Sequence, residues 1–126
     1  MDTKTIVGSV LGGLALFAMG YVMYMLLLAD IITHRGGEPD LLYIILGELV
    51  FGYLIVWTAG VTGAKNPSAG AKAGAIMGVI VGLAISFLEL GENPRAELVT
   101  YLLDVVVWGV RWGVAGAVVG WWLGRD

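Results

Sequence analysis

Long runs of hydrophobic residues alternate with short polar segments along the chain, and this pattern predicts four transmembrane helices. The runs cover about residues 5–32, 41–60, 68–90 and 94–123, and each reaches the roughly 20 residues that a helix needs to cross a bilayer. Short connections force consecutive helices to run antiparallel. The predicted fold is therefore all-α: a single integral membrane domain, residues 1–126, arranged as an up-down-up-down bundle of four transmembrane helices.

Proline and asparagine mark the expected starts of the later helices. Pro39 precedes the second run, and Asn66 followed by Pro67 precedes the third. Asparagine caps helix N-termini, and proline fits the first helical turn because its missing N–H needs no partner there. Asn93 and Pro94 repeat this signal, so we expect the fourth helix to start at position 94.

Glycine recurs at every fourth position of the third run and at similar spacing in the fourth. In lipid the hydrophobic effect does not drive helices together, and small residues allow two backbones to approach closely. We therefore expect the third and fourth helices to pack through glycine-lined faces, as a glycine zipper. The glycines assigned to this packing are Gly70, Gly74, Gly78, Gly82, Gly109, Gly113, Gly116 and Gly120.

Basic residues lie mainly at one end of the predicted bundle. Lys4, Lys65, Lys72 and Arg125 fall on the side that holds both termini, whereas the opposite side carries more acidic than basic residues. Cytoplasmic segments of membrane proteins carry an excess of Lys and Arg. The charge pattern therefore predicts that both termini are cytoplasmic.

The composition agrees with a membrane protein and narrows the possible functions. Of the 126 residues, 59% are hydrophobic and 13% are charged, with no cysteine and one histidine. The chain thus cannot form a thiolate metal site, a thiol nucleophile or a multi-histidine metal or haem site. Its net charge of −3 offers no basic surface for nucleic acid. Because hydrolase, phosphate-loop, zinc and nucleotide motifs are also missing, we expect no enzyme activity, no cofactor and no nucleic-acid partner.

Away from the ends of the predicted spans, the charged residues are Glu48, Asp104 and Arg111. A charge in the hydrocarbon region costs about 3 kcal/mol and rarely faces lipid, so we expect the three to form an intramembrane polar site. Arg111 lies two turns after Asp104, roughly 10 Å along one helix face. Because that contact is long, pairing of Arg111 with Glu48, with a backbone carbonyl or with a second subunit is equally expected. A polar network that fixes helix register is the simplest role for such a site.

The fourth helix presents a charged face and, opposite it, a glycine face. One helix of a four-helix bundle does not easily bury both, so one face is a candidate contact with another chain. The leading hypothesis is a non-catalytic membrane protein that acts by association, as a homo-oligomer or an accessory subunit of a membrane complex. The alternative is a small proton- or cation-coupled transporter or channel that uses Glu48, Asp104 and Arg111. A third interpretation is a lipid or pigment scaffold built on Trp108 and Trp112.

Several short segments carry a resemblance to known proteins. They are residues 20–24 followed by 26–30, residues 70–74, and Asp104 with Arg111 before residues 116–121. In these segments the chain resembles a family of small, uncharacterised four-helix proteins of the bacterial inner membrane. The resemblance implies a multi-pass location in that membrane, with the lipid bilayer as the surroundings, and it implies no mechanism.

Overall fold

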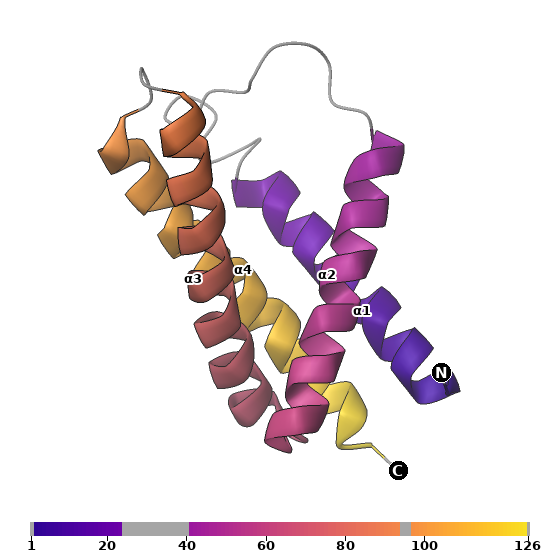
Figure 1. The fold of residues 1–126 in the computed structure, drawn as a ribbon. Helices are drawn as coiled ribbons and strands as arrows, with labels where there is room; N and C mark the ends of the chain where they lie inside the picture. The colour runs from indigo at the N-terminus through magenta and orange to yellow at the C-terminus, as the bar shows by residue number, and fades with distance from the viewer. Residues whose placement is uncertain (1, 24–40, 94–96, 126) are drawn as a thin grey trace.

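The computed structural model describes residues 2–23, 41–93 and 97–125, and these residues form four long α-helices (Figure 1). The helices are α1 (Thr3–Gly20), α2 (Leu41–Thr62), α3 (Pro67–Glu92) and α4 (Leu98–Leu123). Each of the four is long and apolar enough to cross a membrane. The prediction of an all-helical fold with four hydrophobic spans is therefore confirmed.

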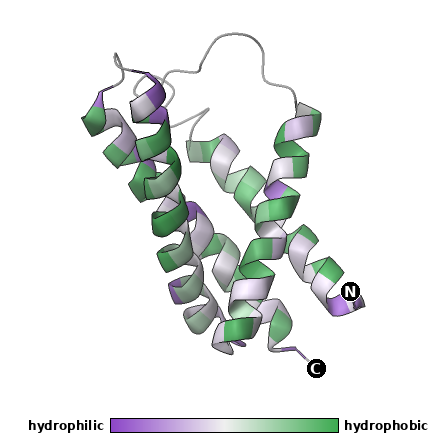
Figure 2. Ribbon diagram, viewed as in Figure 1, coloured by the Kyte–Doolittle hydropathy of each residue, from purple (hydrophilic) through white to green (hydrophobic). Residues whose placement is uncertain are grey.

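The helices alternate in direction, and both ends of the described chain lie at the same end of the bundle (Figure 1). Two closely packed pairs, α1 with α2 and α3 with α4, are joined mainly through the contact of α1 with α4. Figure 2 shows hydrophobic residues along the whole length of every helix. Because α4 contacts α1, α2 and α3, it is the central helix.

The loop between α2 and α3 follows local signals closely. Asn66 accepts a hydrogen bond from the Ala69 N–H at 2.8 Å, and a proline occupies the first turn of α3, as the sequence predicts. Gly63 adopts a φ of +72°, a region that favours glycine. The Ala64 N–H then reaches back to Ala59 O at 2.8 Å, which satisfies one of the last carbonyls of α2.

The two helices that bound the last connection differ from their predicted limits. α3 continues through Gly91 to Glu92, and α4 begins at Leu98 rather than at 94. Asn93 has an extended backbone, and its N–H donates to Glu89 O at 2.9 Å, so it closes α3, whereas the residue directly before α4 is Glu97. The physical reason is that a residue before proline is pushed out of helical geometry. The part of the predicted first helix beyond residue 23 lies outside the described residues.

The apolar core lies where α1, α2 and α4 meet. Trp112 of α4, Leu16 of α1 and Val119 of α4 are the largest fully buried side chains in the described ranges. Phe51 of α2 and Trp108 of α4 pack on Trp112, with ring centroids 5.0 and 6.0 Å from its own. This aromatic cluster fixes one side of α4 against the first two helices.

The other side of α4 lies directly against the backbone of α3. A Cβ atom added to Gly70 would lie less than 3.0 Å from Gly116 O, and one added to Gly116 would lie equally close to Gly70 O. Gly74 faces Trp112 O in the same way, and Gly120 faces the backbone just before α3. These four positions leave no room for a side chain.

The remaining glycines of the two stripes have more varied surroundings. Gly78 and Gly82 face the Trp112 and Trp108 side chains of α4, and Gly109 faces a valine side chain of α3. Gly113 is the least enclosed, because a Cβ there would meet the nearest α3 atom, a Cβ, at 3.4 Å. The closest approach of α3 and α4 therefore lies towards the end that holds the termini.

Candidate functional site

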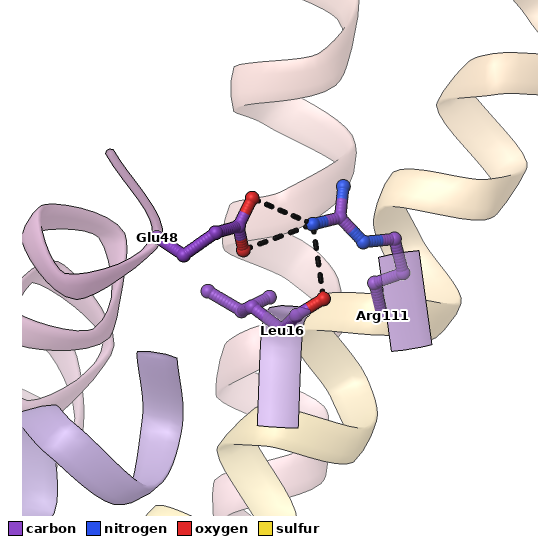
Figure 3. Close-up of polar contacts among 3 residues, drawn as sticks. All are labelled: Leu16, Glu48 and Arg111. Atoms are coloured by element: carbon purple, nitrogen blue, oxygen red, sulfur yellow. Dashed lines mark hydrogen bonds and ion pairs between the residues drawn. The ribbon is translucent and has the colours of Figure 1, made fainter. Parts of the chain in front are cut away.

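Arg111 bridges three helices from the middle of α4. Its Nη2 group donates hydrogen bonds to Glu48 Oε1 at 2.9 Å and Oε2 at 3.0 Å, and to Leu16 O at 3.2 Å (Figure 3). Arg111 is only 5% exposed, whereas the Glu48 side chain keeps 15% of its surface exposed. The buried cation is thus paired with a carboxylate that still reaches the edge of the protein.

The crossing of α1 and α2 brings both acceptors to Arg111. At the crossing, a Cβ on Gly52 would lie less than 3.0 Å from Ser9 O, and one on Gly13 would lie 3.0 Å from Glu48 O. Small residues at these points let the two backbones touch. Glu48 of α2 is thereby placed beside Leu16 O of α1, so that one guanidinium nitrogen reaches both.

The Trp108 ring and the backbone of Gly20 also lie close to the guanidinium. The Trp108 ring centroid lies 5.8 Å from Arg111 Cζ, within the range of a cation–π contact. A Cβ on Gly20 would lie 3.2 Å from Arg111 Nη2, so only glycine leaves full space for the charge there. Directly after Gly20, residues 21–23 widen into a π-helical turn, a feature often found at functional sites.

The structure brings together two of the three predicted site residues. Glu48 and Arg111 form an ion pair, and Arg111 also donates to the Leu16 carbonyl. Two of the expected partners of Arg111, Glu48 and a backbone carbonyl, thus bind it together. Asp104 is half-buried on α4, seven residues before Arg111.

Contrary to expectation, α4 buries both of its opposite faces within the chain. The glycine face contacts α3 through Gly116 and Gly120, and the charged face contacts α1 and α2 through Arg111. Of the four candidate spans, α4 has the largest buried share. Both predicted faces of α4 therefore have neighbours within the chain, because α4 is central rather than peripheral.

Two further buried polar groups belong to the packed interior. Ser86 Oγ on α3 and Trp112 Nε1 on α4 have no hydrogen-bond partner in the described ranges. Ser86 continues the α3 glycine stripe four residues after Gly82, and this spacing could have flagged it as an interface residue. The Leu16 carbonyl, in contrast, has no signal in the sequence.

In the described part of the chain, no group of three or more His, Cys, Asp or Glu side chains is arranged to hold a metal ion. No protein family, curated protein or solved structure matches the chain. The function of the site must therefore be argued from its own geometry.

Proposed function

We propose that the chain is a multi-pass integral membrane protein that acts non-catalytically, by association with other chains. Large apolar side chains project from every helix: Leu14 is 57% exposed, Val50 67%, Leu88 68% and Val106 62%. In water such a surface would be an aggregation hazard, whereas lipid solvates it. Backbone contact through glycine, as between α3 and α4, is also the packing that holds helices together in lipid.

We infer that both termini are cytoplasmic and that the membrane is a bacterial inner membrane. Lys4, Lys65 and Arg125 lie near the end of the bundle that holds the termini, which agrees with the excess of cations on cytoplasmic segments. Expression of the chain with a reporter fused to its C-terminus would test this orientation. A reporter that is active only in the periplasm should stay silent.

The proposed association with another chain rests on the exposed surface of α2 beside Glu48. Residues 42–47 are all exposed, on every side of the helix; we refer to them as the outer α2 segment. Glu48 follows directly and is 15% exposed, although charged groups within a bilayer are rarely left facing lipid. Gly47 offers open space, since a Cβ there would meet nothing within 4 Å. A helix of another chain packed on this segment would cover the ion pair.

Two leucine substitutions test this proposal. Gly47→Leu adds a side chain to the outer α2 segment, and Gly91→Leu adds one to α3, where a Cβ would likewise meet nothing within 4 Å. Native mass spectrometry after gentle extraction should show the wild-type chain bound to a second copy or to a foreign subunit in fixed ratio. Gly47→Leu should lose the bound chain and Gly91→Leu should keep it. A monomeric wild type, or an assembly that Gly47→Leu leaves intact, would refute the proposal.

The partial exposure of Glu48 also supports a second function, a small proton- or cation-coupled transporter. Protonation of Glu48 would remove the negative charge that holds Arg111 Nη2, and the pair could then separate. In this case proteoliposomes should show proton or monovalent cation flux that Glu48→Gln abolishes. Asp104→Asn tests whether Asp104, the acidic residue of α4, also takes part. Unchanged flux in the double variant would exclude both residues as carriers.

A further inference from the structure

A groove opens between α1, α2 and α4 near the end that holds the termini. Its volume is about 320 Å³, and its lining comprises Thr5 of α1, Leu123 of α4 and five residues of α2 between Tyr53 and Val61. Val61 lies eight positions after Tyr53, which makes the groove about 12 Å long along the α2 axis. Apart from the Thr5 hydroxyl and the polar tips of Tyr53 and Trp57, the lining side chains are apolar.

Cationic residues gather where the groove reaches the end of the bundle. The ammonium group of Lys4 donates to Arg125 O, and Lys4 O accepts from Trp122 Nε1 at 2.9 Å, so the start of α1 is fastened to the end of α4. A Cβ on Gly124 would lie less than 3.0 Å from Lys65 O, which brings a third basic residue to the same place.

One acidic residue, Asp2, belongs to this end in the described ranges. Its carboxylate accepts the Thr5 N–H at 2.8 Å and caps α1. Lys4, Lys65 and Arg125 outnumber Asp2 and Asp126, the acidic residue that follows Arg125 in the sequence. A lysine ammonium has three donors, of which one reaches Arg125 O. The rim of the groove is thus suited to a negatively charged group.

We propose that the groove binds one acyl chain of an anionic phospholipid, with the phosphate held by the ammonium group of Lys4. The volume of about 320 Å³ lies at the lower end of ligand pockets. It suits part of a single acyl chain and is too small for a segment of helix about 10 Å across. Tyr53 and Trp57 have an apolar body and a polar tip, as do residues at the level of lipid headgroups. This inference rests on the proposed membrane insertion and not on the proposed association.

Gly60→Leu tests the groove itself. Gly60 lines the groove, and a Cβ there would meet nothing within 4 Å, so a leucine can enter the groove without disturbing the helices. Gly91→Leu is the matched control, because it makes the same change at an open position outside the lining. The purified full chain is placed in mixed micelles with equal amounts of phosphatidylglycerol and phosphatidylcholine, and bound lipid is counted by native mass spectrometry. Gly60→Leu should lose most bound lipid and Gly91→Leu should retain it.

Lys4→Gln tests the headgroup contact. It should reduce the preference for phosphatidylglycerol about fivefold, the effect of one basic residue near an anionic surface, while Lys4→Arg should preserve that preference. Equal retention of the two lipids by the wild type, or wild-type retention by Gly60→Leu, would overturn the proposal. The mass of the protein assembly distinguishes failure of lipid binding from failure of the proposed association with another chain, because Gly60→Leu should leave that mass unchanged.

Discussion

One methyl group added to Gly116 should force α3 and α4 apart, whereas the same addition to Gly113 should not. A Cβ at Gly116 would lie less than 3.0 Å from Gly70 O and 3.0 Å from Gly74 Cα. Both are backbone atoms and cannot rotate away. At Gly113 the nearest atom is Ala75 Cβ at 3.4 Å, close to ordinary van der Waals contact. The two positions lie on one helix and differ mainly in the room that α3 leaves them.

The expected difference in stability follows from two opposing effects. Overpacking costs about 1–3 kcal/mol, and the upper part of that range applies at Gly116 because separating the helices also removes dispersion contacts along the interface. Alanine gains roughly 1 kcal/mol over glycine in helix propensity. Gly116→Ala should therefore destabilise by up to about 2 kcal/mol, whereas Gly113→Ala should be neutral or stabilising by up to about 1 kcal/mol.

Unfolding of the two variants in one detergent, followed by circular dichroism against temperature or added denaturing detergent, measures this difference. Each variant serves as the control for the other, since both carry the same substitution on α4. Unfolding of both variants at the same midpoint, or a lower midpoint for Gly113→Ala, would contradict the close approach of α3 to α4 at Gly116.

Three other predictions concern polar groups. Arg111→Leu leaves Glu48 without its cation and should destabilise by about 3–5 kcal/mol; adding Glu48→Gln should restore part of the loss, which a double-mutant cycle of unfolding free energies measures. Ser86→Ala should be neutral or stabilising by up to about 1 kcal/mol, because the buried Oγ has no hydrogen-bond partner in the described ranges; a clear loss of stability would contradict this. The hydrogen bonds from Thr5 lower the pKa of Asp2 below its ordinary value of 3.8. The Asp2 cap therefore stabilises α1 fully above pH 3.8, and this stabilisation is lost as the pH falls through the lowered pKa. Helicity, measured by circular dichroism, should drop in that pH range, and Asp2→Asn should remove this pH dependence.

The number and character of the helices could be predicted from the sequence because both depend on local pattern. Each apolar run is long enough to cross a bilayer, and Asn66 with Pro67 signals the start of α3 by chemistry that needs no tertiary contact. The same two residue types at 93 and 94 misled, because asparagine before proline can end one helix as readily as it starts another. The observed limits, with α3 ending at Glu92 and α4 beginning at Leu98, show that this pair follows α3 and does not directly precede α4.

The candidate site could be predicted only in part, because its geometry depends on how helices cross. The cost of charge in lipid identified Glu48 and Arg111 as residues that need partners. Their pairing depends on the close approach of α1 and α2 at Gly13 and Gly52, which is a tertiary contact. The third member, Leu16 O, is a backbone carbonyl, and every residue has one. No sequence pattern could have selected it.

The central position of α4 changes what an association experiment can show. Since Gly116 packs against Gly70 within the chain, a bulky residue there tests folding before it tests assembly. Glu48 is also a poor probe of assembly, because its bond to Arg111 helps to hold α2 in place. Loss of assembly in Glu48→Gln would follow from a displaced α2 as well as from a missing partner contact. Gly47 avoids both difficulties: it adjoins Glu48 and faces open space. A defect of assembly in Gly47→Leu, with stability unchanged, would therefore locate the partner on α2.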